Sequence, residues 1–179
     1  LSDGLNSMSG SNAVLLGIVL GLMMAFDMGG PLNKVAYSFA AAGVGTAAAA
    51  SADAPELKIM AAVMLAGMVP PIALALSTVV RPGLYTVAER ENGKAGWLLG
   101  ASFITEGAIP FAAAHPLRVI PSIMLGSGVA GGLVMAFGCE LRAPHGGIWV
   151  IALISQPLLY LLAIAIGAVI ACLSTIFLM

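Results

Sequence analysis

The sequence predicts an all-α integral membrane protein built from transmembrane helices, broken segments and re-entrant hairpins. Of its 179 residues, 60% are hydrophobic and only 8% are charged, and the mean hydropathy of +1.06 lies well above that of soluble domains. A helix that crosses a bilayer needs about 20 apolar residues, so the chain has room for roughly five or six spans. We therefore expect residues 1–179 to form a single membrane domain.

Apolar runs of helix length alternate with short polar breaks in the first half of the chain. Residues 13–26 form the first run, which the glycines and proline of "DMGGPLNK" interrupt before an Ala-rich stretch follows. Gly17 and Gly21 have the spacing of a close helix-packing face. The turn "SADAPE" then leads to residues 57–80, which make a full crossing that tolerates a Pro-Pro kink.

The middle of the chain is predicted to turn back within the membrane. "RPGLYTVAERENGKAG" carries three cations in a short loop, and the positive-inside rule places that loop in the cytoplasm. "WLLGASFI" and "AIPFAAAHP" are each about half a crossing long. They flank Thr105-Glu106-Gly107, which would be the tip of a re-entrant hairpin. Residues 119–137 then form a Gly-rich helix.

A second polar break follows in "GCELRAPHGGI", after which residues 148–179 supply a short apolar piece, a Gln156-Pro157 break and a long final span. Non-helical backbone survives in hydrocarbon only where it is buried in protein or lines a wet cavity. Broken segments in both the early and the late part of a hydrophobic chain point to a transporter site near the bilayer midplane.

Glu106 is a functional candidate because a charge at mid-membrane costs at least about 2.5 to 3.5 kcal/mol unless it is hydrated or paired. The alternative is a structural ion pair with Arg118 or Arg142. Both arginines end apolar runs, where snorkelling to the interface is the ordinary explanation and phosphate steering is the alternative.

His145 and Asp27 extend the candidate site. His145 lies in "APHGG", where an imidazole that donates and accepts hydrogen bonds suits a polyhydroxylated ligand, unless it only bonds within a surface turn. Asp27 and Asn33 flank the first break, where ligand binding and charge pairing with Lys34 are both open. His115 precedes a proline, and we expect it to cap the hairpin rather than bind a ligand.

Other kinds of site find no support in the sequence. A net charge of -1 and a pI near 6.1 give no basic field for nucleic acid. Cys139 and Cys172 are too few and too far apart for a metal set or a disulfide framework, and we interpret both as packing residues. We predict neither a metal nor a cofactor.

Three ordered motifs carry a family resemblance: "FDMGGPLNKVAYSF", "TEGAIPFAAAHPLRVIP" and "LRAPHGGI". Together they resemble the fructose-family enzyme IIC of the bacterial phosphotransferase system. Members of that family carry further membrane helices upstream, so the chain is expected to be the C-terminal half of such a component. It departs from the family at His115, where the motif "AADPLRVIP" has an acid, and this puts any role of that acid in doubt.

The resemblance implies group translocation rather than transport driven by an ion gradient. The membrane component would bind an external, fructose-like sugar and present it to a phosphorylated cysteine of a cytoplasmic IIB domain, which receives its phosphoryl group through IIA. It would have no phosphocarrier residue of its own. The full-length protein would be a multi-pass homodimer in the bacterial inner (cytoplasmic) membrane.

Carried onto this sequence, the resemblance makes Glu106 and His145 the catalytic residues. Glu106 would bind sugar hydroxyls and accept the proton of the attacking one. His145 would contact the sugar or neutralise the transferring phosphoryl group, and Asp27, Asn33 and Thr105 would complete the sugar site. Phosphoryl transfer depends mainly on positioning and electrostatics, so a membrane component contributes without a nucleophile.

Composition alone leaves two other functions open. An ion- or proton-coupled secondary sugar transporter would use Asp27 and Glu106 as coupling charges in a broken-helix site. A non-transporting structural subunit would hold the same acids in ion pairs. A phosphorylated product that requires the phosphocarrier proteins distinguishes group translocation from both.

Overall fold

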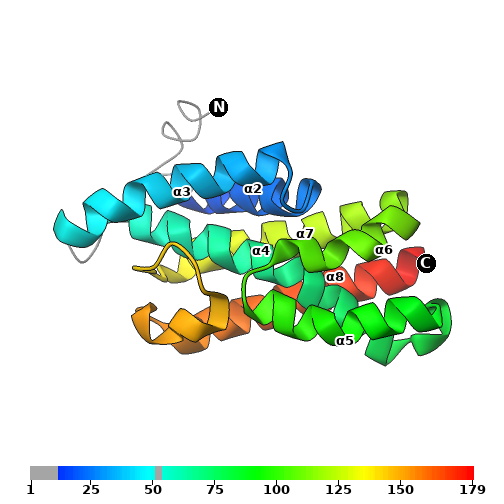
Figure 1. Cartoon of the computed structure of the whole chain (residues 1–179). Coiled ribbons are helices and arrows are strands. Elements are labelled where there is room, and N and C mark those ends of the chain that lie inside the picture. Colours follow the sequence, from blue (N-terminus) through cyan, green and yellow to red (C-terminus); the bar gives the residue numbers. More distant parts are fainter. Residues whose placement is uncertain (1–11, 51–53) are drawn as a thin grey trace.

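The computed structural model describes residues 12–50 and 54–179, and at residues 46–50 it describes only the backbone. The regular secondary structure of these residues is helical (Figure 1). The predicted "SADAPE" turn falls largely outside these residues. The α-helices are α2 (Ala13–Phe26), α3 (Pro31–Ala50), α4 (Pro55–Val80), α5 (Val87–Ala101), α6 (Ile109–Ala114), α7 (Pro116–Phe137) and α8 (Pro157–Leu178). Short 3-10 helices are η1 (Pro82–Leu84), η2 (Thr105–Ala108) and η3 (Gly147–Leu153).

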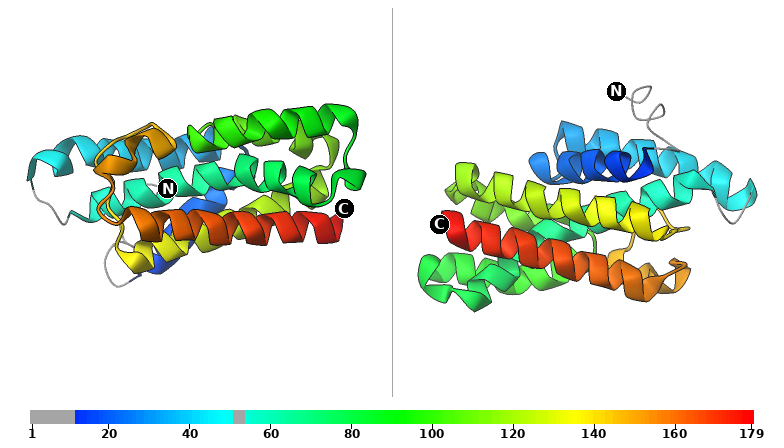
Figure 2. Two further views of the ribbon diagram at one scale, coloured as in Figure 1. Left: turned by 90° about the horizontal axis from the view of Figure 1, so that it is seen from below. Right: turned by 180° about the vertical axis from the view of Figure 1, so that it is seen from behind.

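Helix α4 is the centre of the bundle. Its most apolar window is 89% buried within the protein, and α2, α3, α5, α7 and α8 all pack against it (Figure 2). A helix with neighbours on all sides has no polar face, and the side chains of Met60, Met64 and Leu65 are fully buried. The helix continues through Pro70 and Pro71, as the sequence predicts.

Three helices in the described part of the chain are long and apolar enough to cross a membrane, namely α4 with 26 residues and α7 and α8 with 22 each. At about 1.5 Å per residue, even 22 residues extend over the roughly 30 Å of a hydrocarbon core. Helix α2 is apolar but has only 14 residues. The structure thus confirms the all-α class, with three helices that could span a membrane in the described part of the chain.

Glycines bring α2 and α7 into backbone contact. A Cβ added to Gly17 or Gly21 would collide with the carbonyl oxygens of Gly131 and Ser127, respectively. Gly128 and Gly132 face side chains of α2. The predicted small-residue packing is therefore confirmed, and it holds α2 against the bundle where the first polar break begins.

The cationic loop expected at residues 81–96 is mostly helix, so that prediction is wrong from Val87 onward. Thr86 starts α5 with a capping box, because its hydroxyl accepts from the Glu89 N–H at 3.3 Å and the Glu89 carboxylate accepts from the Thr86 N–H at 2.7 Å. The segment is rich in charged residues, as loops often are, but it contains the capping box that starts a helix.

The bundle has two distinct ends. At one end, His115 Nε2 lies 3.8 Å from Glu89 Oε1, and Arg118 donates to the Met179 carbonyl, so α5, α7 and α8 meet there. At the other end, the Leu141 N–H donates to the Leu57 carbonyl at 3.1 Å. Helix α5 runs inward from the first end, α6 runs back to that end, and the two are joined midway along the bundle (Figure 1).

Substitution of Gly21 by Val tests the α2–α7 contact. We expect the purified protein to lose about 1–3 kcal/mol of stability or more, because the new side chain overlaps the Ser127 carbonyl and forces the helices apart. The measurement is the thermal unfolding midpoint in detergent. Gly83→Val is the control, since a Cβ added to Gly83 would meet no atom within 4 Å, and equal midpoints for the two variants would contradict the contact.

Candidate functional site

The turn between α2 and α3 satisfies its own backbone. Asp27 accepts from the N–H groups of Leu32 at 2.7 Å and Asn33 at 3.0 Å, so its carboxylate caps the start of α3. Asn33 in turn donates its side-chain amide to the Met24 carbonyl at 2.7 Å, at the end of α2. Asp27 therefore holds a helix terminus, and no ion pair joins it to Lys34 in the described chain.

The tip between α5 and α6 is anchored to α4. The buried Thr105 hydroxyl donates to the Gly67 carbonyl at 2.9 Å. A Cβ on Gly67 would lie 2.8 Å from that hydroxyl oxygen, so the tip approaches α4 closely because residue 67 is glycine. Phe103, just before η2, has a φ of +63°, which bulky residues rarely adopt.

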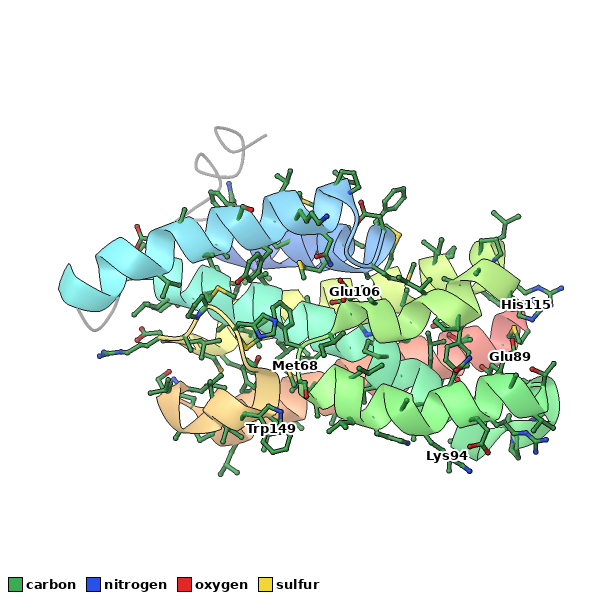
Figure 3. The ribbon with its side chains drawn as sticks, viewed as in Figure 1. Met68, Glu89, Lys94, Glu106, His115 and Trp149 are labelled. Atoms are coloured by element: carbon green, nitrogen blue, oxygen red, sulfur yellow. The ribbon has the colours of Figure 1, made fainter. Side chains whose placement is uncertain are left out.

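Glu106 leaves this tip and lies on the α2–α3 turn (Figure 3). A Cβ on Gly29 would stand 2.5 Å from Glu106 Oε1 and 3.0 Å from its Cγ, so only a glycine allows this contact. Gly29 also has a φ of +102°, in the region that glycine favours. Two breaks that are far apart in sequence thus meet midway along the bundle.

The third break reaches the same tip from the opposite end of the bundle. The rings of His145 and Phe103 have centroids 5.2 Å apart. Trp149 Nε1 donates to Ser102 Oγ at 3.0 Å. Gly147, with a φ of +59°, packs on the backbone of Ala101 and Phe103. The "APHGG" segment is therefore held against the residues that precede Glu106.

The structure brings Glu106, Thr105, Asp27 and Asn33 together at the contact between the first two breaks. His145 joins them through Phe103 and has no hydrogen bond or ion pair of its own in the described chain. The side chains of Glu106 and His145 are both exposed, so in this chain the site is an open face. Ligand binding by these residues stays a prediction.

Glu106 is not held in a structural ion pair within the described residues. Arg118 bonds to Met179 at the far end, and the ion pairs found there and elsewhere join Lys58 to Glu140, Lys94 to Glu91 and His115 to Glu89. The alternative explanation of Glu106 by an arginine partner is therefore wrong for this chain. An accessible carboxylate beside a glycine turn can accept hydrogen bonds from a ligand.

His115 lies remote from these breaks, at the end of the bundle (Figure 3). It sits between α6 and α7 and its Nε2 is 3.8 Å from Glu89 Oε1. This agrees with the prediction that it closes the hairpin. The sequence did not indicate its acidic neighbour, which lies 26 positions earlier.

Both cysteines are buried and unpaired. Cys139, which follows α7, donates weakly to the Gln156 carbonyl at 3.8 Å, and burial raises the pKa of its thiol above the ordinary value. A protonated, buried thiol is a poor nucleophile. Among the described residues, no cluster of His, Cys, Asp and Glu could hold a metal ion.

A separate polar cavity of about 340 Å³ lies at the end of the bundle opposite His115. Glu140, Arg142 and Ser155 line it, together with apolar residues of the segment 152–154. None of the predicted site residues contributes to this cavity.

Sequence reasoning missed Phe103, Gly67 and Trp149. No sequence signal marks Phe103, because its positive φ arises from the contacts around it rather than from its residue type. The glycine pair at 29 and 30 did mark a break, but its partner, Glu106, lies 77 positions later than Gly29.

Apolar helices long enough to cross a membrane, with polar breaks that converge midway along the bundle, are a pattern typical of membrane transport proteins. Curated relatives agree with this class. The chain is 52% identical to the PTS system fructose-specific EIIC component of Haloferax volcanii over 92% of its length. It is 49% identical to the fructose permease IIC component of Bacillus amyloliquefaciens over 95% of its length. The chain is homologous to these fructose-specific EIIC components, which confirms the resemblance.

The homology covers only part of each relative. The chain spans 42% of the Haloferax volcanii protein and 53% of the Bacillus amyloliquefaciens protein. It spans 28% of the PTS system fructose-specific EIIB'BC component of Vibrio cholerae, to which it is 53% identical over 95% of its own length. No family model and no solved structure gives a significant match.

Replacing Thr105 by Val tests whether the tip depends on its bond to α4. We expect a loss of about 1–3 kcal/mol, because the buried Gly67 carbonyl loses its donor while the side-chain volume is nearly kept. Thr105→Ser keeps the hydroxyl and should retain most of the stability. The check is the thermal unfolding midpoint of both variants. A midpoint for Thr105→Val equal to that of the wild type would show that this hydrogen bond does not stabilise the tip.

Proposed function

We propose that this chain is the substrate-binding part of a fructose-family permease of the phosphotransferase system. The full-length protein binds a fructose-like sugar and moves it inward for phosphorylation by a IIB domain. The observation that carries the proposal is the contact of Glu106 with Gly29. It sets an unpaired carboxylate against a polar turn midway along the bundle, in a homologue of EIIC components.

Glu106 has the geometry for sugar recognition. Its carboxylate is exposed, has no cation within ion-pair distance in the described chain, and has its acceptor sites open to sugar hydroxyls. Hydrogen bonds to a charged acceptor are worth more than neutral ones. The same carboxylate accepts the proton of the attacking hydroxyl during phosphoryl transfer.

The other site residues take different roles. Asp27 and Asn33 hold the α2–α3 turn, and Thr105 holds the tip, so these three shape the site that Glu106 enters. His145 is exposed and has no protein hydrogen bond in the described chain, which leaves its imidazole for the sugar or the transferring phosphoryl group. Electrostatic stabilisation of this kind requires donors fixed in advance.

The distribution of cations supports one orientation of the bundle. Arg81, Arg90, Lys94 and Arg118 belong to the segments that meet at the His115 end, which we place in the cytoplasm. Helices α5 and α6 then form a hairpin that enters from the cytoplasmic side and ends midway, a re-entrant hairpin with Glu106 at its tip. The cavity lined by Glu140 and Arg142 faces the outside.

The proposed partners follow from the relatives. Those of Vibrio cholerae and Bacillus subtilis are named EIIB'BC and EIIABC components, so their names join IIB, and in the second case IIA, to IIC. We place a phosphorylated IIB at the cytoplasmic end, with IIA upstream. The full-length protein is a homodimer in the bacterial cytoplasmic membrane, and segments outside this chain cover the open face of the site.

Glu106→Gln tests the sugar-binding role. We expect the dissociation constant for fructose to rise about 10- to 100-fold, because a charged hydrogen bond of about 1.5–3 kcal/mol is lost. The measurement is calorimetric binding to the full-length protein in detergent. Glu91→Gln is the matched control, since Glu91 is exposed and pairs only with Lys94 at the surface.

Unchanged affinity in Glu106→Gln would remove this residue from the site.

The chemical product separates the two transport mechanisms. Sugar phosphate formed only with the phosphocarrier proteins supports group translocation, whereas proton-driven uptake of unmodified sugar would establish the secondary transporter instead.

The two histidines provide an internal comparison. His145→Ala should lower the rate of sugar phosphorylation by at least about tenfold, because a hydrogen bond to a charged group is lost. His115→Ala should lower it by less than about threefold, since His115 lies at the end of the bundle beside Glu89. Phosphorylation assays on the full-length protein with its IIB partner give both rates, and the reverse ranking would contradict the assignment.

A further inference from the structure

Phe103 has a backbone conformation that its residue type disfavours. Its φ of +63° is unusual for a bulky side chain, and such a conformation persists only where the surroundings determine it. The side chain is 6% exposed, so it is almost fully enclosed. Met28, in the turn that Glu106 touches, is the other non-glycine residue with a positive φ in the described chain.

The surroundings of Phe103 come from three other parts of the bundle. Its ring lies 6.1 Å from the Tyr37 ring of α3 and 5.2 Å from the His145 ring. On α4, a Cβ added to Gly67 would collide with the edge of the ring. A Cβ on Gly147 would stand 2.8 Å from the Phe103 backbone nitrogen. Phe103 thus contacts α3, α4 and the "APHGG" segment at once.

His145 depends on this contact for its position. In the part of the chain that the structure describes, its imidazole makes no hydrogen bond and no ion pair, and the Phe103 ring is the aromatic ring that it contacts. Glu106, three residues after Phe103, is fixed separately by its contact with Gly29. Displacing the ring would therefore release His145 and leave the contact of Glu106 intact.

We propose that Phe103 is a positioning residue that holds the His145 imidazole in place relative to Glu106 for phosphoryl transfer. The inference rests on the proposed function and adds a residue to which the sequence assigned no role. It separates two properties of the site. Sugar affinity depends on Glu106, whereas the rate of transfer also depends on the ring of Phe103.

The test is a double-mutant cycle in the full-length protein with its IIB partner. We expect Phe103→Leu to lower kcat for sugar phosphorylation at least about tenfold and to change the dissociation constant for fructose by less than about threefold. Leu keeps the residue apolar but lacks the flat ring that contacts His145. In a His145→Ala background, the same change should lower kcat by less than about twofold, because its target is already gone.

Phe137→Leu is the matched control, since Phe137 is a partly buried phenylalanine that packs on the same apolar core at the end of α7, and its kcat should equal that of the wild type. If Phe103→Leu cannot be purified folded, Phe103→Met, which keeps more of the side-chain length, takes its place in the cycle.

The outcomes are distinct. An equal fall in kcat with and without His145, or an unchanged kcat in the single variant, overturns the positioning role. A weakening of fructose binding as large as the loss of kcat would also overturn it, because the ring would then hold the sugar site itself. If the wild type makes no sugar phosphate while it transports sugar, the proposed function fails, and the positioning role fails with it.

Discussion

Where a helix is interrupted inside an apolar bundle, backbone N–H and C=O groups are left that hydrocarbon cannot satisfy. This constraint shapes the protein around its site. In the first break, nearby side chains satisfy the backbone groups, because Asp27 accepts from two N–H groups of α3 and Asn33 donates to the Met24 carbonyl at the end of α2. At the tip before Glu106, the hydrogen bond joins residues far apart in sequence, since the Thr105 hydroxyl donates to the Gly67 carbonyl of α4. Glu106 and His145 have no hydrogen bond within the described chain, which leaves both side chains open to a ligand.

Glycine makes this arrangement sterically feasible at two levels. Along α2 and α7, it lets helix backbones touch, which places the end of α2 beside the centre of the bundle. At the site, Gly29 accepts the Glu106 side chain and Gly67 accepts the edge of Phe103. Both non-glycine residues with a positive φ in the described chain, Met28 and Phe103, lie beside these contacts, so the strained backbone coincides with the site.

Much of the fold could be predicted from the sequence, because membrane helices are marked by length and hydropathy. The expected helices at 13–26 and 57–80 agree with α2 and α4 to within two residues. The cationic segment was misjudged, since the Thr86–Glu89 capping box acts locally while its charges dominate the composition. Polar breaks located candidate residues, but their pairing was invisible: Gly29 meets Glu106 and Phe103 meets His145 only because the bundle folds them together.

The central claim is that three polar breaks form one sugar site at the contact between Glu106 and Gly29. A structure of the full-length protein with bound fructose tests this most directly. The account predicts sugar hydroxyls within hydrogen-bond distance, roughly 2.6–3.2 Å, of the Glu106 carboxylate, with the His145 imidazole also in contact with the sugar. Fructose bound instead in the cavity lined by Glu140 and Arg142, with Glu106 free of contact, would contradict it.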